Sequence, residues 1–186
     1  MTLQQDTRFS AQAVFDFWRD AGPQKWFDKD DAFDAQFKSR FEAAHEAAAS
    51  GALDGWASDP TGALALLVLL DQFPRNAFRN SARIYATDAK ALAVARSAVD
   101  AGLDKQIEDP ALRAFFYLPF MHSESLVDQD RSVVLCEHAG PDNLRFARHH
   151  RDIVARFGRF PHRNALLGRP STPEELQFLQ EGGFAG

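Results

Sequence analysis

The chain has 186 residues, a formal net charge of −5 and a single cysteine, Cys136. This length predicts one domain, covering residues 1–186, and the lone cysteine excludes an internal disulfide. No apolar run approaches the roughly 20 residues of a membrane-spanning helix, and the N-terminus lacks the basic start and apolar core of a signal peptide. We therefore expect a cytoplasmic protein that binds no membrane.

The first two predicted helices are marked by a cap and by a phenylalanine stripe. Ser10 is a suitable cap for a helix that the Gly-Pro pair at 22–23 would end. An acidic segment then opens a second helix, in which Phe33, Phe37 and Phe41 recur every four residues. This spacing predicts one apolar face that packs against the core.

The next predicted helix is apolar on all sides. It opens at Asp59-Pro60, and its residues 63–70 are Ala, Leu and Val only, so we expect it to lie in the centre of the fold. The segment "DQFPRN" (71–76) follows. Asp71 would then end a helix, where the dipole disfavours a carboxylate, so it needs a partner such as Arg75. That pair either belongs to a site or only braces the turn.

Helix signals continue to the end of the chain. An alanine-rich segment covers 82–102, Ser125 with Asp128 resembles a capping box, and Thr172 with Glu175 forms a better one. No segment alternates polar and apolar residues as a half-buried strand does. We therefore predict an all-α fold of seven to nine antiparallel helices joined by short turns.

Charge is unevenly distributed along the chain. Residues 1–60 hold 11 acidic against 6 basic side chains, whereas residues 142–170 hold 7 arginines, no lysine and 2 aspartates, with three histidines besides. Arginine without lysine indicates bidentate contacts to carboxylate or phosphate, either in a ligand or in the acidic half of the chain. A net acidic domain without a nucleic-acid-binding motif argues against nucleic acid as a partner.

Two histidines are candidates for chemistry. His122 and Glu124 lie in "LPFMHSES", at the break before a helix, where they form either an acid/base pair or an ordinary capping turn. His150 shares an apolar face of the helix 143–157, while its neighbour His149 faces solvent. His150 is thus either a satisfied core histidine or a ligand-binding residue.

A second Phe-Pro turn repeats the first. "FGRFPHRNALLGR" (157–169) places Arg163 and Asn164 after Phe-Pro and one inserted His162, as Arg75 and Asn76 follow Phe-Pro in "DQFPRN". Arginine and asparagine donate hydrogen bonds to anions, and histidine donates or accepts. The two turns either contribute to one polar site or serve only as scaffolding.

Common catalytic and cofactor motifs are missing from the sequence. It contains no G-x-x-x-x-G-K-[ST], G-x-G-x-x-G, H-E-x-x-H, C-x-x-C or G-x-S-x-G. We therefore predict neither a cofactor nor a metal site, although the spacing of the histidines does not exclude a metal.

Several stretches together resemble the bacterial domain of unknown function 924 family. They include "DQFPRN", "LPFMHSES" and "RFGRFPHRNALLGR", and the likeness runs from about Val14 to Leu179. The resemblance implies a helical stack similar to tetratricopeptide-repeat proteins and no established activity. Asn80 departs from it, because the family has glycine after Phe-Arg at this turn.

The leading prediction is a binding module with one Arg/His-rich polar pocket for an anionic small molecule or an acidic peptide. The alternative is a metal-independent hydrolase that acts on a phosphorylated or carboxylated metabolite, with His122 and Glu124, or His162, as acid and base. The protein could also form a homodimer, which the sequence neither predicts nor excludes. The predicted ligand-binding residues are Asp71, Arg75, Asn76, His122, Glu124, His150, Arg159, His162, Arg163 and Asn164.

Overall fold

The computed structural model describes residues 9–184, and within that range the chain is helical with no strand, which confirms the all-α class. The expectation about a signal peptide falls mostly on residues 1–8, outside this range. The α-helices are α1 (Ala11–Phe27), α2 (Asp31–Ser50), α3 (Pro60–Leu67), α4 (Phe73–Ala77), α5 (Asp88–Asp100), α6 (Pro110–Arg113), α7 (Leu118–Met121), α8 (Leu126–Cys136), α9 (Pro141–Phe157) and α10 (Pro173–Gln180). Short helical turns join them: η1 (Asp54–Ser58), η2 (Val68–Gln72), η3 (Ala82–Tyr85), η4 (Asp104–Gln106), η5 (Ala114–Phe116) and η6 (Pro161–Arg163).

Three predicted helix starts are confirmed. The Ser10 hydroxyl accepts the N–H of Ala13, and the Asp59 carboxylate accepts that of Gly62. Thr172 and Glu175 form the predicted capping box. These side chains satisfy N–H groups that have no partner within the helix.

One predicted helix end is confirmed, and one predicted capping box is wrong. Gly22 interrupts α1 as predicted: its φ of 75° and ψ of 170° are not helical, and a second helical segment follows this kink and ends at Phe27. Ser125 precedes α8 without capping it through its side chain. The acidic residue of the expected box, Asp128, instead accepts a hydrogen bond from the Ser123 hydroxyl at 2.8 Å.

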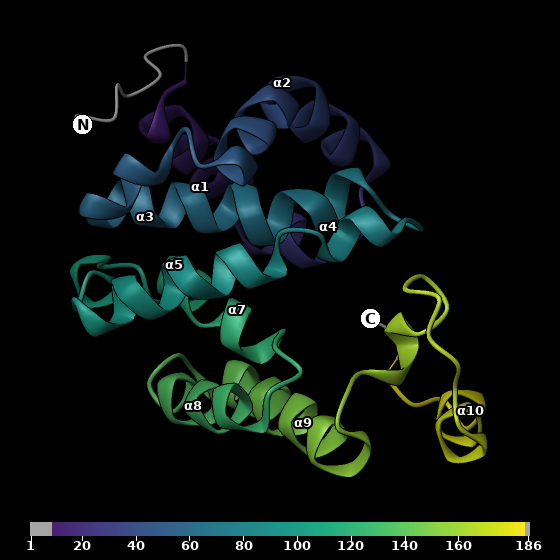
Figure 1. Ribbon diagram of the computed structural model, residues 1–186. Coiled ribbons are helices and arrows are strands. Elements are labelled where there is room, and N and C mark those ends of the chain that lie inside the picture. Colours follow the sequence, from purple (N-terminus) through teal and green to yellow (C-terminus); the bar gives the residue numbers. More distant parts are fainter. Residues whose placement is uncertain (1–8, 185–186) are drawn as a thin grey trace.

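The core is built around α3, as the sequence predicted. Every residue from 63 to 70 is at most 1% exposed. The phenylalanine face of α2 is also confirmed, because Phe33, Phe37 and Phe41 are buried. In Figure 1, α1 and α2 lie with α3 in one half of the molecule, α8 and α9 lie side by side in the other, and α5 runs between them.

The helix that begins at α3 continues through η2, a π-helical turn, into α4. In η2 the N–H of Phe73 reaches back five residues to the carbonyl of Val68. Asp71 therefore lies inside a continuous helix and not at its end, so this part of the prediction is wrong. Pro74 has no N–H to give to the carbonyl of Leu70, which is why the ordinary pattern is interrupted here.

Side chains from other parts of the fold satisfy the carbonyl groups of this π turn. Such turns occur often at functional sites, and here the side chain of Asp71, within the turn, contacts His122 from a distant segment. The carbonyls of Leu69, Leu70 and Asp71 accept hydrogen bonds from His45 Nδ1 (2.9 Å), Thr87 Oγ1 (2.5 Å) and Arg75 Nη1 (2.6 Å).

The helices after residue 125 position the second Phe-Pro turn. His150 on α9 is buried and His149 is exposed, as predicted. Gly158 ends α9 in the left-handed conformation, and Phe160, fully buried, packs with Ile153 and Val154. Cys136 is buried, and burial raises the pKa of its thiol to about 11. Within residues 9–184, every helix is too short or too polar to cross a membrane.

Candidate functional site

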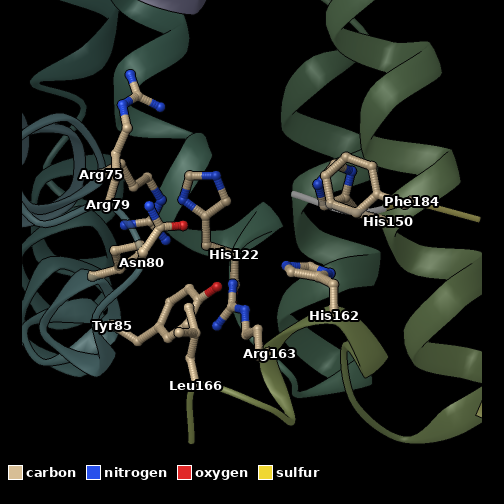
Figure 2. A pocket seen from close by; sticks show the side chains of 11 residues that line it. Arg75, Arg79, Asn80, Tyr85, His122, His150, His162, Arg163, Leu166 and Phe184 are labelled. Atoms are coloured by element: carbon tan, nitrogen blue, oxygen red, sulfur yellow. The ribbon is translucent and has the colours of Figure 1, made fainter. Parts of the chain in front are cut away.

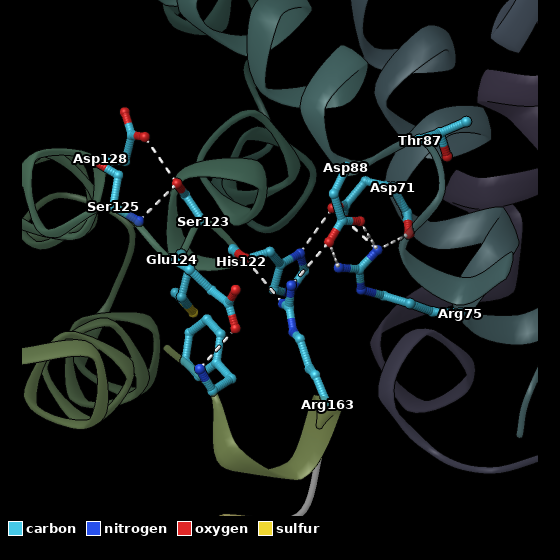
Figure 3. A network of polar contacts seen from close by, with 12 residues as sticks. Asp71, Arg75, Thr87, Asp88, His122, Ser123, Glu124, Ser125, Asp128 and Arg163 are labelled. Carbon is cyan, nitrogen blue, oxygen red and sulfur yellow. Dashed lines mark hydrogen bonds and ion pairs between the residues drawn. The ribbon is translucent and has the colours of Figure 1, made fainter. Parts of the chain in front are cut away.

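A polar network joins three segments that are far apart in the sequence (Figure 3). Arg75, in α4, donates from its two Nη atoms to the two oxygens of Asp88, at 2.9 and 3.2 Å. Arg163, in η6, donates from Nη1 to the same carboxylate at 3.1 Å. The two Phe-Pro segments, of which the first is part of α4 and the second leads into η6, therefore meet at Asp88.

Asp88 was missing from the predicted site residues. It is the first residue of α5, where an acidic side chain is ordinary for a helix start, so its sequence context gave no other signal. The packing of α5 beside η2 brings it to the arginines. Their shared partner also explains why both arginines are held close together despite like charge.

His122 and Asp71 form a buried pair in this network. His122 Nδ1 lies 2.7 Å from Asp71 Oδ1, while Arg75 supplies the predicted ion pair at 3.4 Å and Gln72 donates to the second oxygen. Burial opposes ionisation of Asp71, but Arg75 and His122 outweigh it and hold its pKa well below the usual range. The Asp71 carboxylate therefore stays ionised and accepts a hydrogen bond from the Nδ1–H of His122.

His122 is neutral in this arrangement. Burial and the nearby Arg75 lower its pKa, and Asp71 only partly offsets them. With the proton on Nδ1, the lone pair lies on Nε2. Among the residues described, none hydrogen-bonds to Nε2, and the ring borders a cavity. His122 can therefore accept a hydrogen bond or a proton from a bound molecule.

Arg163 is held between two aromatic rings. Its guanidinium carbon lies 4.5 Å from the ring centroid of Tyr85 and 4.7 Å from that of Phe160. Nη2 donates to the carbonyl of His122 at 2.9 Å. Burial lowers the pKa of Arg163, with Asp88 opposing. Its buried Nε has no hydrogen-bond partner among the described residues.

These groups border a cavity of about 380 Å³ (Figure 2). Five of the predicted site residues line it: Arg75, His122, His150, His162 and Arg163. Three distant segments therefore contribute to one cavity. Six further lining residues were missed: Arg79, Asn80, Ile84, Tyr85, Leu166 and Phe184.

The other two lining histidines are also neutral. His150 Nδ1 donates to the carbonyl of Phe146 at 2.8 Å. Burial lowers the pKa of His150 to about 3, with His122 adding to the effect. Burial, followed by the charge of Arg163, lowers the pKa of His162 to about 4. One side of the cavity therefore carries arginines and the other carries neutral imidazoles, as Figure 2 shows.

We expect the free energy of unfolding to decrease as the pH falls below 6.5, because His150 is neutral when folded and takes up a proton when unfolded. Its pKa is lower in the folded state, so its contribution is complete above 6.5 and is lost as the pH falls towards about 3, at about 1.4 kcal/mol per pH unit. His150→Gln should flatten this slope in urea titrations between pH 7 and 4.5. His149→Gln, at the exposed neighbour, is the control. Equal slopes for His150→Gln and wild type would contradict a buried neutral His150.

The remaining predicted residues lie outside the lining, and each has a partner elsewhere. Asn76 donates to Asp34 at 2.7 Å. Arg159 and Asn164 both donate to Glu175. Asn164 and Arg159 thus fasten α10 to the segment before it.

Glu124 also departs from its predicted role. Its carboxylate accepts two hydrogen bonds from Arg169, at 2.7 and 2.9 Å, and one from the N–H of Phe160. Burial opposes ionisation of Glu124, but these contacts lower its pKa. The carboxylate that orients His122 is therefore Asp71 and not Glu124, because residues two apart at this break face different neighbours.

Asn80 shows why the turn after α4 favours glycine. Among the described residues it alone is a non-glycine residue with positive φ, at 63°. Asparagine tolerates this left-handed conformation better than most residues do. The substitution therefore keeps the turn and adds an amide side chain to the lining of the cavity.

The fold and the cavity define an all-α protein with a pocket lined by arginine and histidine. Residues 14–183 match the model of the bacterial proteins of unknown function named DUF924. The chain belongs to this family. The likeness to tetratricopeptide repeats that the family implied stays a prediction.

A solved structure agrees with this assignment. It is that of a protein of unknown function from Agrobacterium tumefaciens, 53% identical in sequence, with a TM-score of 0.90, and the match covers 92% of this chain and 97% of that one. No curated protein matches the chain. The comparisons therefore give the family and the fold, and the function must be argued from the site.

Proposed function

We propose that the protein binds a small anionic molecule in the cavity between the two Phe-Pro turns. The observation that carries the proposal is the convergence of Arg75, Arg79 and Arg163 on one cavity of about 380 Å³. This volume is within the range of small-molecule pockets. The terminal carboxylate of an acidic peptide offers the same chemistry and would enter the same cavity.

Arginine N–H groups without an acceptor support anion binding more than the net charge around the cavity does. Three carboxylates, those of Asp34, Asp71 and Asp88, already pair with the three arginines. Arg79, however, gives only its Nε to Asp34, and no described residue accepts from its terminal nitrogens. These terminal N–H groups fit the oxygens of a carboxylate or phosphate.

Calorimetric titration with inorganic phosphate and with benzoate tests the proposal. Arg79→Ala should weaken binding about tenfold or more, because a hydrogen bond to a charged group contributes about 1.5–3 kcal/mol. The matched control is Arg83→Ala, which removes the same charge. Arg83 is exposed, lies outside the lining of the cavity and pairs with Glu46. Equal losses in both variants, or no binding by the wild type, would refute the proposal.

Hydrolysis is the second candidate, and the Asp71–His122 pair is the observation that favours it. His122 Nε2 would take a proton from water as the water oxygen forms a bond to a carbonyl carbon or a phosphorus atom. The bond from that atom to the leaving group would then break, and His122 would give the proton to the leaving group. No serine, threonine or cysteine is in the described lining, and the proposed nucleophile is therefore water activated by His122. The arginines would hold the developing negative charge.

The substrate would be a phosphorylated or carboxylated metabolite. Turnover of a phosphomonoester, ester or amide panel should be lost in both His122→Ala and Asp71→Asn and kept in His149→Ala. Absence of turnover by the wild type on the whole panel would remove this candidate and leave the binding proposal standing.

A further inference from the structure

The ring of Phe184 lies against the histidine side of the cavity (Figure 2). Its centroid is 4.5 Å from that of His150 and 5.1 Å from that of His162, both in edge-to-face geometry. A third contact, at 5.8 Å, joins it to His149. Phe184 thus packs between the rings of His150 and His162.

The backbone conformation at the two glycines before Phe184 places its ring against these histidines. Gly182 has a φ of 83°, in the left-handed region that favours glycine. Gly183 passes so close to α10 that an added Cβ would lie 2.5 Å from the carbonyl oxygen of Phe178 and 2.6 Å from its ring. The position of Phe184 therefore depends on both glycines.

The cavity has two chemically different ends. Arg75, Arg79 and Arg163 suit an anionic group, whereas His150, His162 and the ring of Phe184 form an aromatic end. Phe184 is itself one of the residues that line the cavity.

We propose that the ligand is an aromatic carboxylate or phosphate, and that its ring replaces the ring of Phe184 between His150 and His162 when its anionic group meets the arginines. This inference rests on the proposed function. Phe184 then competes with the ring of the ligand for the same position, and its side chain must leave that position when the ligand binds.

The test compares phenyl phosphate with inorganic phosphate by calorimetry in the wild type and in Phe184→Ala. Aromatic pairs contribute about 0.5–1.5 kcal/mol, so removing the competitor should raise the affinity for phenyl phosphate, relative to phosphate, by about three- to tenfold. Gly183→Ala should shift the ratio in the same direction by displacing Phe184 through the chain. Phe146→Ala, which removes an exposed ring on α9, is the matched control. Benzoate in place of phenyl phosphate shows which anionic group is preferred.

Three results of these titrations would each overturn a different part of the proposal. A lower relative affinity for phenyl phosphate in Phe184→Ala would make Phe184 a fixed wall of the site and overturn displacement. Phenyl phosphate that binds no tighter than phosphate in any variant would overturn the aromatic end, while the anion site stands. Failure of phosphate, phenyl phosphate and benzoate alike to bind would overturn the proposed function itself.

Discussion

Replacing Glu175 by alanine should lower the free energy of unfolding by about 3 kcal/mol, because the change breaks an ion pair with a buried carboxylate and removes an acceptor from Arg159, Asn164 and the N–H of Thr172. Glu175 is 2% exposed. Its carboxylate accepts from Arg159 Nε at 2.6 Å, from Arg159 Nη2 at 2.8 Å, and from the N–H of Thr172 at 2.7 Å. The loss should therefore release α10 from η6.

The lowered pKa of Glu175 determines how its contribution to the free energy of unfolding depends on pH. Hydrogen bonds from Arg159, with further help from Thr172 and Asn164, lower the pKa of Glu175 to about 2 although burial opposes them. Its stabilising contribution is therefore complete above about 4.5 and is lost as the pH falls towards 2.

Glu174→Ala is the matched control for urea unfolding of Glu175→Ala. Glu174 is the exposed neighbour, and it makes one surface ion pair with Arg156. Such pairs contribute about 0–1 kcal/mol, so this variant should unfold almost as the wild type does. A similar loss in both variants, or a loss below 1 kcal/mol in Glu175→Ala, would contradict the role given to the buried carboxylate.

Arg163→Ala should lower both stability and anion affinity. The change removes the bond to Asp88, the bond to the carbonyl of His122 and the stacking between Tyr85 and Phe160. We expect the free energy of unfolding to fall by about 3 kcal/mol and phosphate to bind at least about tenfold more weakly.

Arg163→Lys separates charge from geometry. Lysine keeps the positive charge but has neither the planar fork nor the same stacking, so it should restore only part of both losses. Denaturation and titration of the two variants measure this. Full restoration of stability by lysine would show that charge alone matters, and unchanged phosphate affinity in Arg163→Ala would limit Arg163 to bracing the fold.

The sequence predicted most of the helices because their signals are local. Ser10, Asp59 and Thr172 cap helices through bonds to residues three positions away, and the apolar run of α3 is visible directly in the sequence. The π turn was not predicted. Its cause is Pro74, but its stability depends on His45 and Thr87, which are distant in the sequence.

The candidate site was predicted only where a residue type was unusual in its context. Arg75 and Arg163 stood out through the repeated Phe-Pro turn, and His150 through its place on an apolar face. Asp88 looked like an ordinary helix start, and its contact with two arginines exists only in the folded chain. Conversely, Glu124 was paired with His122 because they are close in sequence, whereas the fold turns it to Arg169.

The most direct test of an anion site is to locate a bound anion in a crystal. Crystals grown without phosphate or sulfate and soaked in selenate would show the anion by the anomalous scattering of selenium. We predict a peak in the cavity, within hydrogen-bond distance of Arg79 and Arg163. Peaks confined to surface lysines and arginines, with none in the cavity at a saturating selenate concentration, would contradict the account.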